Sequence, residues 1–163
     1  MKQSQASLAF AEAIKDAENL LAHFDKLNTK PPPPENEVLK RAGLVMAMTA
    51  WETYVEDRVA EAAASRVSGI PDIVLSTFVQ TRLKEEIKKL HNPNSDKTIQ
   101  LFEDYAGVNV STEWKWSHVD SSVAKQRLNG YLKLRGDVVH RSALSRKDRR
   151  RRIQSRRRTC RRP

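Results

Sequence analysis

Apolar residues recur at steps of three and four along most of the chain, which is the spacing of one face of an α-helix. In the first such segment, roughly residues 4 to 28, they are Leu8, Ala11, Ile14, Ala17, Leu21, Phe24 and Leu27. The sequence KPPPP at residues 30–34 then interrupts the pattern. Because proline lacks an amide hydrogen and clashes with the preceding turn, we expect a first amphipathic helix to end before it.

Two more helices follow from the same spacing. The second is predicted from about Asn36, as its N-cap, to about Val67, where the sequence SGIP ends it. The third carries apolar positions from Ile73 to Leu90 and stops at HNPN, residues 91–94. Both helices are long enough to present an apolar face to a shared core.

The C-terminal half is predicted to add a short helix and a final one. The short helix lies within DKTIQLFEDYAG, and the irregular segment NVSTEWKWSH follows it. The final helix begins near Asp120 or Ser121 and shows an apolar face from Val123 to Val139. Because no segment alternates in the manner of a strand, we predict an all-α, up-and-down helical bundle.

Composition agrees with a soluble helical protein: 39% of the 163 residues are hydrophobic, 31% are charged and only five are glycine. The single Cys160 rules out an intrachain disulfide and fits a reducing compartment. No apolar run reaches the roughly 18 to 20 residues of a membrane span, and the N-terminal segment contains acidic residues that a signal peptide lacks. We therefore expect a cytoplasmic protein without a membrane partner.

The formal charge of +10 is concentrated at one end of the chain. Residues 141–163 carry twelve Lys and Arg against one Asp, whereas residues 1–140 carry 18 basic and 19 acidic side chains. We predict a helical domain over residues 1–141 and a disordered, arginine-rich tail over residues 142–163. Such a tail would bind polyanions in a salt-dependent way. A shifted reading frame or a truncation would produce the same abrupt change, and both interpretations stay open.

The stretch LRGDVVHR, residues 134–141, places Arg135 and His140 five residues apart near the predicted end of the last helix. On a helix this separation is about 140° around the axis and about 7.5 Å along it, so the two share a site only if both edges border one groove. Asp137 could orient the imidazole of His140, or pair with Arg141 four residues later. A helix end with ordinary solvated cations would contain the same residues.

Beyond this stretch, the chain resembles the HEPN superfamily, and most closely its RiboL-PSP type. The similar pieces are AWETYVED (50–57), HNPN (91–94), TIQLFEDYAGV (98–108), EWKW (113–116) and LRGDVVHR (134–141). In this superfamily the last core helix carries an Arg-x4–6-His motif, which Arg135 and His140 match. The residue after the arginine is often polar in the superfamily, and here it is Gly136.

The resemblance implies a metal-independent endoribonuclease that acts on RNA as a homodimer, with the motifs of two chains facing each other. It would be a toxin or defence component, with a cognate antitoxin or another protein as partner. In the reaction a 2′-hydroxyl attacks the neighbouring phosphate, Arg135 grips that phosphate and His140 transfers a proton. The alternative is a catalytically inactive HEPN module that binds RNA or a protein.

Several other residues are candidates around this motif. Glu52 could support the active helix, although it could also be solvated or paired with a lysine. Trp114 or Trp116 could stack an RNA base, and Arg141 could also contact RNA. The alternative for the two tryptophans is that they pack the loop onto the bundle. The sequence shows no Cys/His cluster, and no His or Asp of ligand spacing lies near Glu52 and Glu56, so we predict neither a metal nor a cofactor.

Overall fold

The computed structural model describes residues 4–27, 29–31, 33 and 35–139. The expected tail, together with His140 and Arg141, lies outside the described residues. Within these ranges the protein is all-α, as predicted, and the described part of the chain contains no strand. One isolated antiparallel bridge joins Trp116 to Val119.

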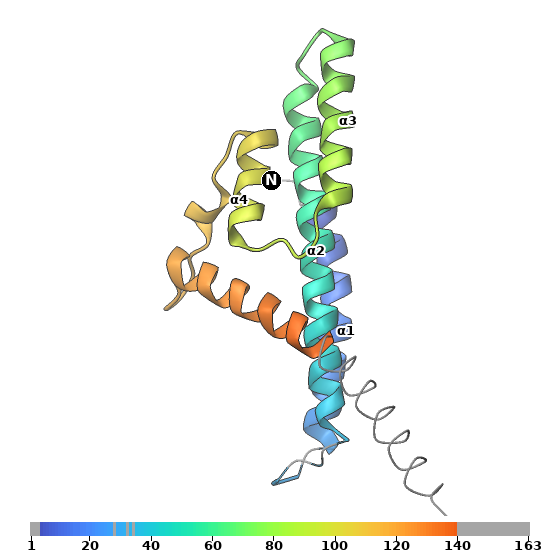
Figure 1. Cartoon of the computed structure of the whole chain (residues 1–163), viewed down its shortest axis with the longest axis vertical. Helices are drawn as coiled ribbons and strands as arrows, with labels where there is room; N and C mark the ends of the chain where they lie inside the picture. Colours follow the sequence, from blue (N-terminus) through green and yellow to red (C-terminus); the bar gives the residue numbers. More distant parts are fainter. Residues whose placement is uncertain (1–3, 28, 32, 34, 140–163) are drawn as a thin grey trace, which may run out of the picture.

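Helices α1 (Gln5–Leu27) and α2 (Glu37–Val67) form a long antiparallel hairpin, and their bounds agree with the prediction (Figure 1). Asn36 precedes α2, but its side chain does not cap the helix. Instead its Nδ2 donates a hydrogen bond to the carbonyl of Leu27 at 2.8 Å. This contact ties the end of α1 to the start of α2 across the proline-rich loop.

Helices α3 (Ile73–Lys89) and α4 (Ser95–Ala106) both pack against α2. Each begins at a side-chain cap: Asp72 accepts hydrogen bonds from two amides of α3, and Asn94 accepts one from the amide of Lys97. These caps satisfy helix-terminal amides that would otherwise lack a partner. α4 ends at Gly107, whose φ of 67° lies in the left-handed region that glycine adopts without strain.

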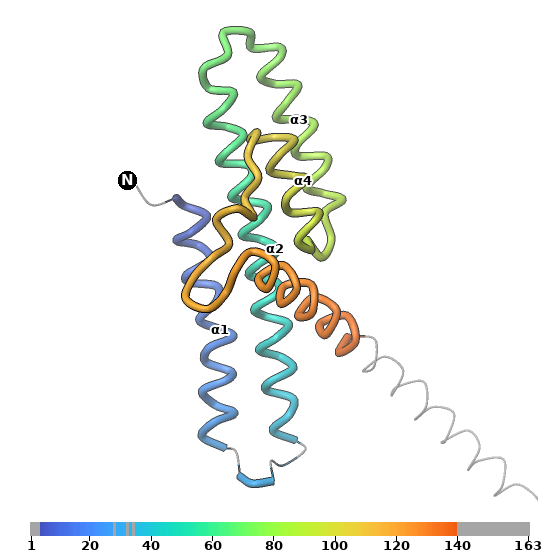
Figure 2. Tube along the Cα trace, turned by 90° about the vertical axis from the view of Figure 1, so that its left-hand side faces the viewer, coloured from blue at the N-terminus to red at the C-terminus, as the bar shows by residue number. Residues whose placement is uncertain are grey.

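A short 3-10 helix, η1 (Val110–Glu113), leads to the last helix, which is described over residues 121–139. Its start is as predicted, because the carboxylate of Asp120 accepts a hydrogen bond from the amide of Val123 at 2.8 Å. Figures 1 and 2 show this helix running at a steep angle to α2 instead of alongside it. In Figure 1 the C-terminal end of its described part lies at α2.

The main hydrophobic core lies where α2, α3 and α4 meet. It consists of Val55, Val59, Ala63, Leu83, Leu101, Phe102 and Ala106. Val55 and Val59, four residues apart on one face of α2, are almost completely buried.

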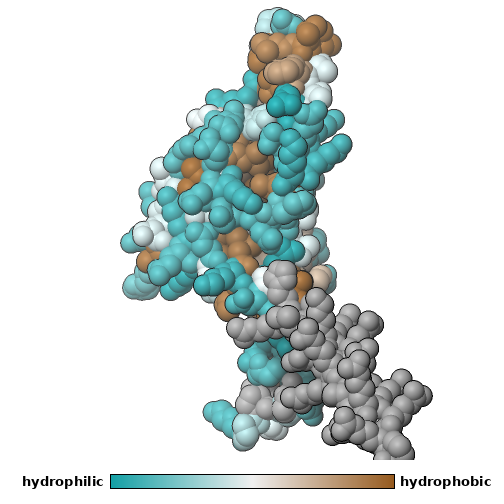
Figure 3. Space-filling model, in the orientation of Figure 1, coloured by the Kyte–Doolittle hydropathy of each residue, from teal (hydrophilic) through white to brown (hydrophobic). Residues whose placement is uncertain are grey.

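Other apolar side chains remain exposed in the single chain. On α1, Leu8 and Leu21 were predicted to belong to the apolar face, yet both are exposed, whereas Ala17 and Phe24 are buried. At the tip of the α2–α3 hairpin, the first turns of α3 form the hydrophobic area at the upper end of Figure 3. The spacing of apolar residues alone therefore predicts more buried side chains than a single copy of the chain contains.

Candidate active site

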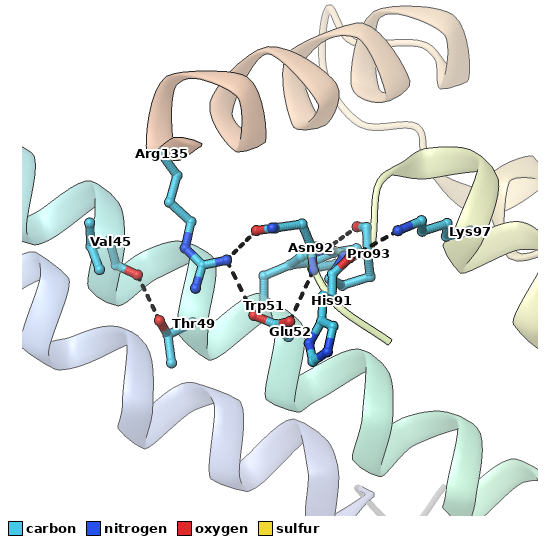
Figure 4. A network of polar contacts seen from close by, with 9 residues as sticks. All are labelled: Val45, Thr49, Trp51, Glu52, His91, Asn92, Pro93, Lys97 and Arg135. Carbon is cyan, nitrogen blue, oxygen red and sulfur yellow. Dashed lines mark hydrogen bonds and ion pairs between the residues drawn. The ribbon is translucent and has the colours of Figure 1, made fainter. Parts of the chain in front are cut away.

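The side chain of Arg135 reaches from the last helix to α2 and to the loop between α3 and α4 (Figure 4). Its Nη1 lies 3.3 Å from Oε2 of Glu52 and also donates a hydrogen bond to Oδ1 of Asn92. The other carboxylate oxygen of Glu52 accepts a hydrogen bond from the amide of Asn92 at 3.0 Å. Three residues far apart in sequence thus form one closed polar network, which we call the Arg135 cluster.

The loop that supplies Asn92, residues 91–94, is held in place on several sides. Asn92 has a φ of 51°, in the left-handed region, which asparagine tolerates better than most residues. The next residue, Pro93, is buried, and its carbonyl accepts a hydrogen bond from Nε1 of Trp51 at 3.0 Å. Asn94 then caps α4. The position of the Asn92 amide is therefore fixed by α2 and by the start of α4.

A second tie places the last helix relative to this loop. The side chain of Asn129 accepts a hydrogen bond from the amide of Ser95 and donates one to its hydroxyl, both at 2.9 Å. Ser95 is almost fully buried whereas Asn129 is exposed, so these contacts are sheltered from water on the side of Ser95. Because Asn129 lies six residues before Arg135 on the same helix, these two hydrogen bonds help to position the part of the helix that carries Arg135.

A second carboxylate, that of Glu56, lies near this cluster on α2. Glu56 lies one turn after Glu52 on α2, and its pKa is raised by partial burial, with further contributions from Glu52 and Asp57, while His91 opposes the shift. The side chains of Arg135 and Glu52 are 21% and 18% exposed. An anion can therefore still reach the guanidinium, although much of the pair is sheltered from water.

The structure brings together two of the predicted residues, Glu52 and Arg135. Asp137 is exposed, and the described residues show no ion pair for it. Asn92 is a part of the cluster to which the sequence assigned no role, although HNPN was among the pieces of the resemblance. The sequence could have pointed to Asn92 because it lies in a tight turn directly before a helix cap. Only the fold shows that it contacts Glu52.

The two tryptophans of the EWKW segment differ in environment. Trp114 is half-buried and packs edge-on against Trp51, with ring centroids 6.1 Å apart and an interplanar angle of 77°. Trp116 is 60% exposed, in a turn closed by two backbone hydrogen bonds to Val119. Trp114 therefore packs the loop onto α2, and the ring of Trp116 is accessible from solvent.

Over residues 4–139, leaving aside the positions not described, no three His, Cys, Asp or Glu side chains gather as a metal site would require. In the same part of the chain, none of the helices has the length and hydropathy to cross a membrane.

Comparison with known proteins gives one match. A model of the RiboL-PSP-HEPN family matches residues 12–155, a range that contains the whole Arg135 cluster and His140. No curated protein and no solved structure matches the chain. Since the family match covers most of the sequence, the chain belongs to the RiboL-PSP-HEPN family.

Proposed function

We propose that this protein is a metal-independent endoribonuclease that cleaves RNA through attack of a 2′-hydroxyl on the adjacent phosphate. The observation that carries the proposal is the Arg135 cluster: Glu52 and Asn92 fix a guanidinium at the surface, five residues before His140 in the sequence. A guanidinium held in this way is suited to binding a phosphate without first being ordered.

The chemistry fits what these side chains can do. Both contacts within the cluster use Nη1 of Arg135, so among the described residues its Nη2 and Nε hydrogens are left for two phosphate oxygens. His140 supplies an imidazole, the type of side chain that takes up and releases protons near neutral pH. The 2′-oxygen loses its proton and bonds to phosphorus, and the bond to the 5′-oxygen breaks as that oxygen gains a proton. The products are a 2′,3′-cyclic phosphate and a free 5′-hydroxyl.

This reaction favours a homodimer. Cyclising cleavage benefits from one group that removes a proton and another that supplies one, yet each chain has a single motif histidine. A two-fold axis near the last helix would place a second His140 opposite the first. A strictly monomeric protein at micromolar concentration, measured by light scattering, would count against this assembly.

The biological setting that we propose is a cytoplasmic toxin or defence component restrained by a cognate antitoxin or another protein. One observation favours a second candidate, an inactive HEPN module that binds RNA or a protein. Glu52 already neutralises part of the charge of Arg135 in the free chain. In an inactive module this ion pair would be structural. Replacing Arg135 would then change the free energy of unfolding, and neither the wild type nor the variant would cleave RNA.

The test compares variants of the full chain on a labelled RNA in the presence of EDTA. His140→Ala should lower the rate by about 10² to 10⁴, because it removes the proton-transfer group. Arg135→Lys should also lose cleavage activity, since an ammonium lacks the planar guanidinium that binds two phosphate oxygens. The matched control is Arg127→Lys, at an exposed position of the same helix, which should cut normally.

Two results would contradict the proposal. Equal cleavage by His140→Ala and the wild type would show that the Arg-x4-His motif does not carry out the reaction. Cleavage that is lost only when EDTA is added would mean that the reaction depends on a metal.

A further inference from the structure

A cavity of about 190 Å³ lies between α2, α4 and the segment that follows α4. The rings of Trp51, Tyr54 and Trp114 form part of its wall, and most of the remaining wall is aliphatic. The volume is below the roughly 300 to 1,000 Å³ of pockets for drug-sized ligands, whereas an apolar cavity of about 150 Å³ already holds one benzene ring. The cavity is therefore of a size for a single flat ring system.

The cavity and the Arg135 cluster both contact the same short stretch of backbone, Asn92 and Pro93. The carbonyl of Pro93 accepts hydrogen bonds from two residues that line the cavity, Trp51 at 3.0 Å and Thr98 at 3.4 Å. The residue before it, Asn92, contacts Glu52 and Arg135. Trp51 and Glu52 are also consecutive on α2. The two sites therefore share a wall made of α2 and the loop at residues 91–94.

One cationic side chain lines the cavity, and it is also within ion-pair distance of a carboxylate. Arg58 lines the cavity six residues after Glu52, which is about 9 Å along the helix axis. Its Nη1 lies 3.7 Å from Glu61, too far for a hydrogen bond, and its side chain is 39% exposed. A planar guanidinium in this position can face the edge or the plane of a bound ring. The hydroxyl of Thr98 is already used by Pro93, so the cavity has few groups that could distinguish one base from another.

We propose that this cavity is a nucleobase subsite, which takes up one base of an RNA whose phosphate is held by Arg135. The proposal rests on the proposed function, because it assumes that RNA is what Arg135 binds. Aromatic rings bind bases of any sequence, since every base presents a π-face. The subsite would thus position the strand for cleavage without selecting a particular sequence.

The experiment measures binding of an RNA that cannot be cut. The probes are a hexamer of 2′-O-methyl adenosine and the same 2′-O-methyl backbone without bases, each labelled for fluorescence anisotropy. Both keep all phosphates, so contacts to the backbone cancel in the ratio of the two dissociation constants; salt of about 0.3 M weakens such contacts further. The full-length wild type should bind the adenosine hexamer about tenfold more tightly than the abasic chain.

Variants that fill the cavity should lose this preference. Ala62→Leu adds three carbon atoms to the cavity wall and should reduce the ratio to about twofold. Val108→Phe, at an exposed position of the rim, is a second blocking variant whose folding depends little on the core. Ala64→Leu, exposed on the same helix, is the control and should keep the wild-type ratio. Trp116→Ala tests separately whether the exposed ring of Trp116 binds the base instead.

The outcomes separate this proposal from the nuclease. An unchanged ratio in both blocking variants, or a wild type that binds both probes equally, would overturn the subsite, whether or not RNA is cut. A tenfold preference that only the blocking variants lose would support the subsite even in a protein without cleavage activity. In that case the nuclease reaction would fail and the base-binding site would stand. Loss of the preference in Trp116→Ala alone would place base binding elsewhere and overturn the proposal.

Discussion

The ion pair between Glu52 and Arg135 should couple these two residues more strongly than an ordinary surface pair. Both side chains are about four-fifths buried, and the charged atoms lie 3.3 Å apart. Hydrogen bonds to charged groups contribute about 1.5–3 kcal/mol, whereas exposed ion pairs contribute about 0–1 kcal/mol. Because the distance is long and some solvent reaches the pair, we expect a coupling free energy of about 1–2 kcal/mol.

A double-mutant cycle measures this coupling. The free energy of unfolding in urea would be compared for the wild type, Glu52→Gln, Arg135→Gln and the double variant. The control is the same cycle on Arg82 and Glu85, which are 2.6 Å apart but about half exposed on one helix. That pair should give about 0.3–0.5 kcal/mol. If the coupling of Glu52 to Arg135 is no larger than that of the control, the cluster does not hold the guanidinium as we argue.

Three further predictions concern stability. Since the pKa of Glu56 is raised above its ordinary value of 4.5, the folded state holds this proton more tightly than the unfolded state, and the residue destabilises the fold at neutral pH. Glu56→Gln should therefore raise the free energy of unfolding at pH 7, with the gain shrinking as the pH falls through the raised pKa towards 4.5. On α3, Leu83→Ala should cost about 2–5 kcal/mol in urea unfolding because Leu83 is 4% exposed, whereas Phe78→Ala should cost under about 1 kcal/mol because Phe78 is 61% exposed. Gly130→Ala should stabilise the last helix by about 0.5–1 kcal/mol in the same assay, because a Cβ there meets nothing within 4 Å; a loss of stability would show an unforeseen clash.

The helices could be predicted from sequence because their signals are local. The spacing of apolar residues, the prolines after α1 and the Asn–Pro–Asn turn before α4 each act within a few residues, and α1 and α2 have the expected bounds. The cap of the last helix at Asp120 is equally local. Such features do not depend on how the helices pack.

The arrangement of the site depended on long-range contacts that no spacing encodes. Nothing in the pattern indicates that the C-terminal part of the last helix lies against α2, or that Asn92 contacts Glu52 forty residues earlier. The sequence did identify Arg135 and Glu52 as candidates, Arg135 with the support of the family resemblance and Glu52 from its position on the second helix. Their pairing required the fold, and so did the cavity beside them. The roles of Asp137, Trp116 and the motif histidine remain predictions.

The most direct test of the central claim is a comparison of two synthetic RNAs that differ at one sugar. The wild-type protein would be incubated in EDTA with an RNA that it cuts at a mapped position, and with a copy carrying a 2′-deoxy nucleotide directly before that position. Mass spectrometry would identify the new ends. Our account predicts a 2′,3′-cyclic phosphate from the first RNA and no cleavage at that position of the second. Equal cleavage of both RNAs would show that the 2′-hydroxyl is not the nucleophile and would contradict the mechanism built on Arg135.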